Sequence, residues 1–406
     1  MLKYNPFRPN SIVRPGMFKG RYGEVSNIQQ SLIQAKNGNA SHFAILGERG
    51  IGKSSLLFLI EKLCSGQLPL FDGSKLNFLV LSMELESSDD NLGVIRKIGQ
   101  CLRSSISELQ KAKSSLNDIW TFLKGWEILG VKYNSQFENM DVHEATNQLA
   151  KALRDIIKTK EVEGIALLID EADRPPATAN LGENIKLLTE RLSKYDCDKV
   201  LIGLAGQQDL IEKLRSSHES SPRLFQVLDL QPLTYQERIE VLDAGISEAN
   251  ADGKSSVLFT DEAKNEIAAL SEGYPHFLQQ FAFCAFAEDS DNKIDTEDVN
   301  KSIFSESGAL EQLGQMYFKD LYLNKIGSDD YRKVLQCMAQ SMDEWVSRPD
   351  ILEKTGLKEH TLTNAVRALK QRGVILSKDG SKGVYRLPTK SFAVWIKAYS
   401  ANAHVL

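Results

Sequence analysis

The stretch Gly47-Glu48-Arg49-Gly50-Ile51-Gly52-Lys53-Ser54 decides how this chain folds. The apolar run at 42–46, His-Phe-Ala-Ile-Leu, precedes it and predicts a buried strand, whereas the run at 55–63 follows it and predicts a helix. Glycines allow the backbone between them to curl, so that successive N–H groups point at one place. The N-terminus of a helix adds partial positive charge there. The stretch therefore predicts an anion-binding loop between the first strand and the next helix.

The letters of this loop, G-x-x-x-x-G-K-S, are those of the phosphate-binding loop of P-loop NTPases. We expect Lys53 to reach the β- and γ-phosphates of ATP and the Ser54 hydroxyl to ligate Mg²⁺. A chance glycine turn is the alternative, and the flanking strand and helix argue against it. The expected nucleotide contacts of the loop are Gly47, Glu48, Arg49, Gly50, Ile51, Gly52, Lys53, Ser54 and Ser55.

Length and composition predict an ordinary multidomain protein. The 406 residues suffice for two or three domains. No run of about 18 apolar residues occurs and the N-terminus lacks an apolar signal core, so we expect a cytoplasmic protein that does not enter a membrane. The five cysteines are scattered and never spaced C-x-x-C, which fits a reducing compartment and argues against disulfides and a zinc site.

Further apolar runs predict a parallel sheet around the first strand. After 42–46 come runs at 77–83, 164–169, 199–205 and, more briefly, 226–230. Helical stretches, including 141–158 and 181–195, alternate with them, and this βα alternation is typical of a parallel sheet.

The third of these runs ends in Asp170-Glu171, which is the Walker B pattern of four apolar residues followed by two carboxylates. A carboxylate at the carboxyl end of a buried parallel strand faces the loop that follows a neighbouring strand. We expect Asp170 to hold Mg²⁺ through water and Glu171 to orient or deprotonate the attacking water. The alternative is a strand that merely ends in acidic turn residues, and the phosphate loop upstream argues against it.

With these motifs and the segment Phe18-Lys19-Gly20-Arg21-Tyr22-Gly23-Glu24, the chain resembles AAA+-type ATPases of the STAND or origin-recognition-like group over roughly residues 6–305. The resemblance implies an α/β fold with a P-loop NTPase (AAA+-like) parallel five-stranded sheet core, an all-α lid and a C-terminal winged helix-turn-helix. The boundaries we expect are 1–232 for the core, 233–305 for the lid, 306–327 for a connecting helix and 328–406 for the winged helix.

The resemblance also implies roles for single residues. It places Arg21 near the adenine and makes Gln207, or else Gln208, the side chain that senses the γ-phosphate. It makes Arg223, with Arg215 as the competing choice, an arginine finger that reaches the nucleotide of a neighbouring subunit in a homo-oligomer. A surface arginine and a plain polar loop are the alternatives. The catalytic residues expected are Glu171, Lys53, Arg223 and Gln207.

The lid departs from ordinary AAA+ ATPases. Thr234-Tyr235-Gln236-Glu237 reads as a capping box that opens its first helix. Where those ATPases carry a sensor arginine, this chain reads 271–278, Ser-Glu-Gly-Tyr-Pro-His-Phe-Leu, which resembles STAND ATPases. Pro275 suits the first turn of a helix, and His276 is expected either to point at the nucleotide or to be a buried structural histidine. This departure favours a switch that holds nucleotide and hydrolyses it slowly.

Residues 85–140 are longer than a simple crossover needs. They contain a predicted helix at 92–113 and two tryptophans, Trp120 and Trp126. Such a segment either contacts a partner or covers its own core, and the second is the default expectation.

The C-terminal part reads as a winged helix. Helices are predicted at 329–340, from 347 to 355 and at 358–372, then a hairpin at 374–387 and a last helix at 389–400. Residues 328–406 carry 13 Lys and Arg against 8 Asp and Glu, whereas the whole chain is acidic, with a net charge of −5. Such a basic module is expected to bind duplex DNA. The alternatives are a basic surface that is merely solvated and a winged helix that docks a protein or inhibits its own chain. The candidate DNA contacts are Lys358, Thr363, Asn364, Arg367, Lys370, Arg372, Lys378 and Lys382.

Two functions are compatible with these features. The first is a nucleotide-controlled switch whose winged helix binds DNA or a partner protein, with oligomerisation and an effector on another chain. The second is a DNA-loading or DNA-remodelling ATPase of the origin-recognition or transposition-targeting kind. A scaffold that only stores nucleotide disagrees with the intact Lys53, Ser54, Asp170 and Glu171.

Overall fold

The computed structural model describes residues 4–110, 141–251, 256–305, 307–324, 326–341, 344–378 and 380–402. The chain divides into two compact units, which we call the sheet unit, Ile12–Gln231, and the helical unit, formed by Met1–Ser11 with Pro232–Leu406. Trp120 and Trp126 lie outside the described residues. Among the helices that are described, each is too short or too polar to cross a bilayer.

The sheet unit is built on five parallel strands in the order β2-β3-β4-β1-β5. This confirms the predicted parallel five-stranded core, and the observed strand ends lie within one residue of the predicted ends. The strands are β1 (His42–Leu46), β2 (Phe78–Glu84), β3 (Gly164–Asp170), β4 (Val200–Gly206) and β5 (Phe225–Asp229).

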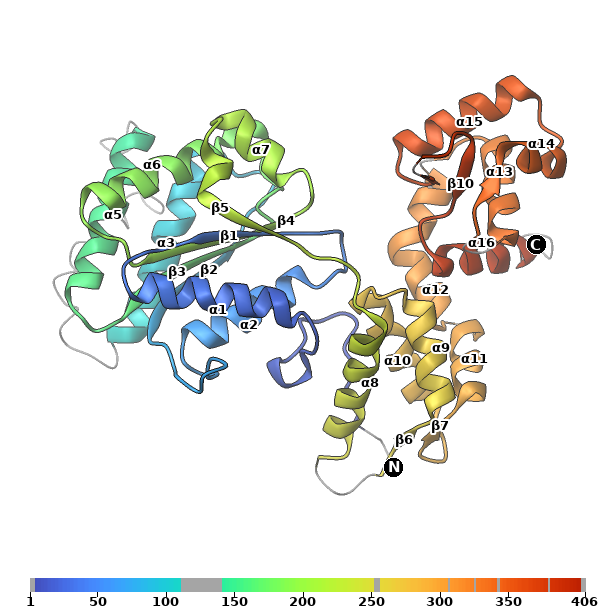
Figure 1. Cartoon of the computed structure of the whole chain (residues 1–406), viewed down its shortest axis with the longest axis horizontal. Coiled ribbons are helices and arrows are strands. Elements are labelled where there is room, and N and C mark those ends of the chain that lie inside the picture. Colours follow the sequence, from blue (N-terminus) through green and yellow to red (C-terminus); the bar gives the residue numbers. More distant parts are fainter. Residues whose placement is uncertain are drawn as a thin grey trace, which may run out of the picture. The chain divides into compact units, whose positions relative to one another are not determined.

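Helices cover both faces of this sheet (Figure 1). Helices α1 and α2 pack on one face, whereas α3, α5, α6 and α7 lie on the other. Apolar side chains of α3, α5 and α6 join those of the strands in one buried cluster, which includes Ile98, Leu149 and Leu188. The helices are α1 (Tyr22–Lys36), α2 (Lys53–Cys64), α3 (Asn91–Gln110), α5 (Val142–Lys158), α6 (Leu181–Lys194) and α7 (Leu210–Ser217), with single 3₁₀ turns at Pro15–Met17, Ala177–Ala179 and Ser221–Leu224.

The strand order places β4 between β1 and β3, so the carboxyl ends of all three meet at one edge. Gly203 lies in the middle of β4, opposite Phe43 of β1 and Leu168 of β3. A Cβ on Gly203 would stand 2.4 Å from Cζ of Phe43 and 3.0 Å from Cδ2 of Leu168. The missing side chain therefore makes room for the Phe43 ring at the centre of the sheet.

The helical unit contains the predicted lid. Its helices are α8 (Tyr235–Ala249), α9 (Asp261–Ser271), α10 (Pro275–Glu288) and α11 (Thr296–Phe304). The lid also holds one short parallel pair, β6 (Leu258–Phe259) with β7 (Lys293–Ile294), which the all-α description omitted.

Two sequence signals in the lid are confirmed. The Thr234 hydroxyl accepts a hydrogen bond from the Glu237 N–H, and the Thr234 N–H donates to the Glu237 carboxylate, as the capping box predicted. Pro275 begins α10, as its position in the sequence indicated.

Residues 4–11, which we grouped with the core, belong to the helical unit. The buried Phe7 ring lies edge-on to Phe259 and Phe286. The backbone N–H of Arg8 donates to Oε1 of Gln279 at 2.8 Å. The first residues of the chain therefore complete the core of the lid.

The C-terminal part of the helical unit has the predicted winged-helix elements, with differences in detail. A third strand, β8, joins the hairpin to give the order β8-β10-β9. The predicted connecting helix begins as α12 (Ala309–Leu313) and continues as two π-helical segments, Gly314–Phe318 and Asp320–Asn324. The other elements are α13 (Asp329–Gln340), β8 (Val346–Ser347), α14 (Arg348–Thr355), α15 (Glu359–Gln371), β9 (Leu376–Ser377), β10 (Val384–Arg386) and α16 (Lys390–Asn402).

The contact between Gly203 and Phe43 gives a test of the sheet. We expect Gly203→Ala to lower the free energy of unfolding by about 1–3 kcal/mol, because the added methyl group overlaps the Phe43 ring. Combining Gly203→Ala with Phe43→Leu should recover part of this loss, because the smaller leucine side chain can move away from the added methyl group. Denaturant unfolding of the wild type, the Gly203→Ala variant and the double variant measures both effects.

Gly23→Ala is the matched control. Gly23 lies in the first turn of α1, and a Cβ there meets no atom within 4 Å. The substitution should be neutral or stabilise the protein by up to about 1 kcal/mol. An equal loss of stability in both single variants would show that the Phe43 contact is not the cause.

Candidate functional site

The loop between β1 and α2 has the geometry of an anion cradle. Gly50 and Gly52 have φ values of 81° and 102°, which residues with a side chain rarely adopt. Helix α2 begins at Lys53, and no side chain caps its N-terminus. The N–H groups of a first helical turn have no acceptor within the helix. In this loop they remain available to an anion such as a phosphate.

The Lys53 side chain folds back onto the loop and bonds to its backbone. Its Nζ donates hydrogen bonds to the carbonyl oxygens of Gly47 at 2.9 Å and Glu48 at 3.0 Å. Burial lowers the pKa of this ammonium, and the nearby carboxylates of Glu171, Asp170 and Asp173 oppose the shift. The lysine is therefore a partly buried cation held at the mouth of the loop.

Arg21 supports the same loop from the preceding segment. Its guanidinium is 5% exposed and donates to the Ile51 carbonyl at 2.8 Å. It also pairs with Glu24 at 3.7 Å. The resemblance placed Arg21 near the adenine, whereas the contact in the structure is with the backbone of the phosphate loop.

Asp170 and Glu171 stand at the carboxyl end of β3. Asp170 is the last residue of the strand, and its Oδ1 accepts the N–H of Glu171 at 2.8 Å. Glu171 has a left-handed backbone with φ of 51°, where the chain turns away from the sheet. Its carboxylate pairs with Nε of Arg174 at 3.1 Å, but both side chains are substantially exposed. A pair of this kind contributes little free energy, so Glu171 is not fixed to Arg174.

Asp173 is a site residue to which the sequence analysis gave no role. Its side chain is 4% exposed, and Oδ1 accepts the backbone N–H of Gln207 at 2.9 Å. Its Oδ2 accepts the Gln207 side-chain amide at 3.2 Å. The carboxylate that follows β3 therefore holds the residue that follows β4. The run Asp-Glu-Ala-Asp was the only signal for it in the sequence.

The remaining sensor and finger candidates occupy different positions. Gln208, the alternative sensor, donates to Oδ1 of Asp229 at 2.6 Å, at the end of β5. Arg223 lies in the 3₁₀ turn before β5 and Arg215 lies on α7, and both are exposed. Their exposure suits contact with another subunit and does not distinguish between them.

These residues fit a nucleotide with Mg²⁺. The curled glycine loop, the uncapped helix and Lys53 supply donors for phosphate oxygens. The Ser54 hydroxyl and the Asp170 carboxylate are the oxygen ligands that Mg²⁺ prefers. No cluster of three or more metal-ligating side chains occurs among the described residues.

Pro275 and His276 belong to the helical unit, and their proposed contact with nucleotide stays a prediction. The His276 ring lies 5.3 Å from the Tyr317 ring, edge to face. This packing fits the structural alternative that the sequence left open for His276.

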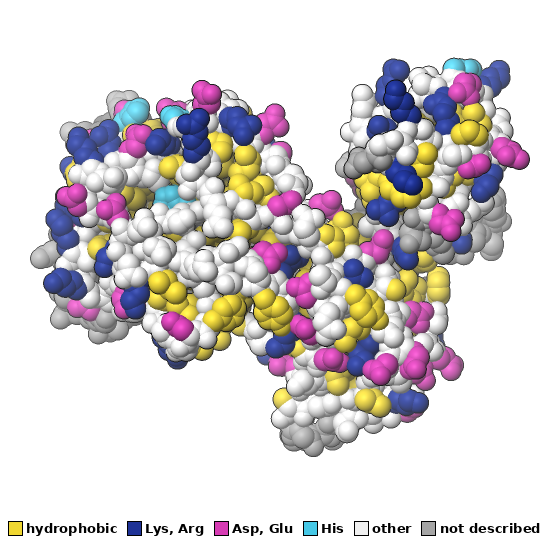
Figure 2. Space-filling view, in the orientation of Figure 1, with side chains coloured by type: hydrophobic (Ala, Val, Ile, Leu, Met, Phe, Trp, Pro, Cys, Tyr) yellow, Lys and Arg dark blue, Asp and Glu magenta, His cyan; other side chains and the backbone are white. Residues whose placement is uncertain are grey.

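The winged helix presents most of the candidate DNA contacts to solvent. Its third helix, α15, buries Leu362, Ala365, Val366 and Leu369 on one face. Lysine and arginine side chains gather over α15 and the hairpin in Figure 2. The exposed candidates are Lys358, Asn364, Arg367, Lys370, Arg372, Lys378 and Lys382.

Thr363 differs from the other candidates because its hydroxyl is already bonded. It accepts from Nη2 of Arg348 at 2.7 Å and donates to the Glu359 carbonyl at 2.8 Å. Arg348 also binds the Glu359 carboxylate at 2.8 Å. These contacts tie the start of α14 to the start of α15 and so fix the angle between the two helices.

Comparisons with known proteins support this description of the fold. No family model matches the chain. A curated protein of Methanocaldococcus jannaschii, described as an uncharacterized HTH-type transcriptional regulator, is 25% identical over 287 residues. That match covers 68% of this chain and 64% of the regulator, so it spans less than two thirds of that protein.

Two solved structures resemble the whole chain. A Walker-type ATPase of Pyrococcus abyssi is 17% identical with a TM-score of 0.55, and the match covers 98% of this chain and 99% of that one. The ORC2 protein of Aeropyrum pernix, solved as ADPNP–ADP complexes, is 14% identical with a TM-score of 0.58 and 99% coverage of both chains. The chain therefore has the AAA+-like P-loop fold of origin-recognition-type ATPases, with a C-terminal winged helix.

Proposed function

We propose that this chain is a Mg²⁺-dependent ATPase that acts as a slow nucleotide switch, and that the winged helix binds duplex DNA as its output. The observation that carries the proposal is the uncapped N-terminus of α2, with Lys53 at its mouth and Asp170 and Glu171 at the end of β3. The similarity to a Walker-type ATPase and to a nucleotide complex of ORC2 supports it.

Binding begins with exchange of partners at Lys53. Its Nζ leaves the carbonyl oxygens of Gly47 and Glu48 and donates to phosphate oxygens instead. Charge-assisted bonds of this kind are stronger than bonds to neutral carbonyls, so the exchange favours the bound state. Ser54 and Asp170 hold Mg²⁺, which neutralises charge on the phosphates when it is bound.

Hydrolysis requires a water aligned with the γ-phosphate. Glu171 stands beside Asp170, where its carboxylate can accept a proton from that water once it leaves Arg174. Asp173 holds the Gln207 amide at the neighbouring strand end, and we propose that Gln207 reports the presence of the γ-phosphate. Arg223 on a second copy of the chain is the proposed finger, and Arg215 is the alternative.

Slow turnover is proposed from the lid. The segment 271–278 contains no arginine that could stabilise the transferred phosphate, and Pro275 and His276 occupy its place. We therefore favour a switch in which the nucleotide state changes DNA binding and oligomerisation. An effector protein on another chain is a further proposed partner.

A DNA-loading or DNA-remodelling ATPase is the second candidate. The similarity to the ORC2 protein favours it, since the match extends over nearly the whole of both chains. Fast hydrolysis that duplex DNA stimulates would support this candidate over the switch.

Lys53→Ala tests nucleotide binding. We expect ATP affinity to fall at least about tenfold, because hydrogen bonds to charged groups contribute about 1.5–3 kcal/mol. Isothermal titration calorimetry measures the change. Lys62→Ala is the control, since Lys62 lies on the same helix but pairs with Glu61 and covers the Phe58 ring. Unchanged affinity in Lys53→Ala would refute the proposed site.

Glu171→Gln tests hydrolysis separately from binding. The amide cannot accept the proton, so we expect turnover to fall by about 100-fold or more while ATP stays bound. Phosphate release and nucleotide retention after gel filtration give the two measurements. Glu183→Gln, an exposed glutamate on α6, is the control and should leave both unchanged. Normal turnover in Glu171→Gln would remove Glu171 from the mechanism.

A triple variant with Lys370, Arg372 and Lys382 changed to alanine tests the winged helix. Loss of three phosphate contacts should weaken binding to duplex DNA and reduce its salt slope by about 2–3. Fluorescence anisotropy at several salt concentrations measures both.

A charge-matched control removes Lys293, Lys301 and Lys319, which are exposed in the helical unit outside the winged helix. That variant should keep the slope of the wild type. If the wild-type protein shows no duplex binding at low salt, the winged helix docks a protein instead.

A further inference from the structure

The turn between α9 and α10 contains a glutamate in an unfavourable conformation. Glu272 follows the last residue of α9 with φ of 49°, in the left-handed region. Helices commonly end in this way, but with glycine, because a Cβ is disfavoured there. Gly273 follows with φ of 86°, so the one glycine of the turn does not occupy this position. A non-glycine residue in this strained conformation suggests that the Glu272 side chain has a role.

The Glu272 carboxylate caps a helix that lies 118 residues further along the chain. Its Oε2 accepts the backbone N–H of Lys390, the first residue of α16. A carboxylate at a helix N-terminus satisfies a free N–H group and interacts favourably with the helix dipole. Ser391 completes the contact, since its buried hydroxyl donates to the Leu270 carbonyl at 2.9 Å. Two hydrogen bonds therefore join the end of α9 to the first turn of α16.

The same turn is bonded to the start of the helical unit. The Gly273 carbonyl accepts the N–H of Leu233 at 2.8 Å. A Cβ on Gly273 would stand 2.4 Å from the Leu233 carbonyl oxygen, so the two backbones are in close contact. Leu233 is the second residue of the unit after the boundary at Pro232. The turn that caps α16 is therefore bonded directly to the segment that follows this boundary.

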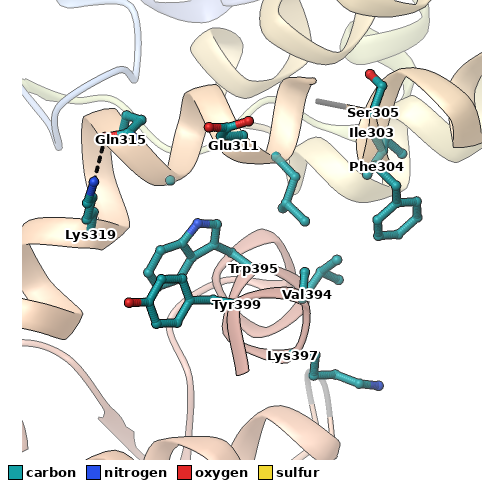
Figure 3. Close-up of a pocket in the computed structure, with 13 residues that line it drawn as sticks. Ile303, Phe304, Ser305, Glu311, Gln315, Lys319, Val394, Trp395, Lys397 and Tyr399 are labelled. Carbon is teal, nitrogen blue, oxygen red and sulfur yellow. Dashed lines mark hydrogen bonds between the residues drawn. The ribbon is translucent and has the colours of Figure 1, made fainter. Parts of the chain in front are cut away.

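On its other side, α16 faces a pocket of about 800 Å³ (Figure 3). Trp395 and Val394 of α16 point toward it, opposite the segment that carries Gln315 and Lys319. Trp395 stacks on Tyr399 with ring centroids 5.1 Å apart. Trp395 is nevertheless buried, and a Cβ on Gly314 would stand 2.0 Å from its Nε1. The helix is therefore held by the cap at its first turn and by close packing along its middle.

We propose that Glu272 is a positioning residue that couples the lid turn 271–276 to α16, and through α16 to the winged helix. The inference rests on the proposed function, in which nucleotide state controls DNA binding. It adds the residue through which that control passes within the helical unit.

The test compares duplex affinity in two nucleotide states for the full chain. Fluorescence anisotropy gives the Kd of a labelled duplex with ADP and with a slowly hydrolysed ATP analogue. The coupling ratio is the quotient of the two Kd values, and couplings between sites commonly lie between about 5- and 150-fold. We expect Glu272→Ala to bring the ratio to within about twofold of one, with ATP affinity within about twofold of wild type.

Three further variants separate coupling from folding. Glu272→Gly removes the same carboxylate but relieves the left-handed backbone, so it should lose coupling with a higher Tm than Glu272→Ala. Glu272→Gln keeps an oxygen that accepts the Lys390 N–H and should retain most of the ratio. Ser391→Ala removes the second bond and should reduce the ratio in part.

The outcomes are distinct. A wild-type ratio well above one that falls in Glu272→Ala and Glu272→Gly but not in Glu272→Gln supports the inference. A wild-type ratio that all four variants keep overturns the role of Glu272 and leaves the proposed function standing. A wild-type ratio of one means that nucleotide does not control DNA binding, and the proposed switch fails together with the inference.

Discussion

The sheet unit depends on one constraint at the end of β1, where the chain must leave a buried strand and start a helix within a few residues. Glycines make this turn possible, and Lys53 closes it by donating to the carbonyls of Gly47 and Glu48. No side chain caps the start of α2, and the first N–H groups of a helix have no acceptor within the helix, so a ligand or water must satisfy them. The unusual backbone and the proposed binding site are therefore the same feature.

The sheet gives this loop its chemical neighbours. Because β4 separates β1 from β3, the residue that follows β4 lies between the phosphate loop and Asp170. Asp173 uses this arrangement by holding Gln207 through both its backbone and its side chain. The buried Asp173 carboxylate therefore links the end of β3 to the end of β4 through hydrogen bonds.

Much of the fold could be predicted from the sequence because buried parallel strands read as continuous apolar runs. Lys53, Ser54, Asp170 and Glu171 could be proposed as site residues for a related reason, since their motifs need a strand end and a helix start beside them, and the structure has both. Asp173 could not, because its partner Gln207 is 34 residues away and meets it only through the strand order. The Glu272–Lys390 contact spans 118 residues and leaves no local pattern. The π-helical segments after α12 also lack a periodic signal of their own.

Residues 4–11 have a consequence for how the chain is made. Asn5 donates to the Phe283 carbonyl across a separation of 278 residues, and Phe7 is buried beside Phe259 and Phe286. During synthesis these first residues emerge long before their partners, and the whole sheet unit is translated in between. The sheet unit can thus fold while the lid core is still incomplete, because distant contacts form late. A ribosome-bound chain that stops before α10 would contain the complete sheet unit, whereas its N-terminal segment would lack the partners that α10 supplies.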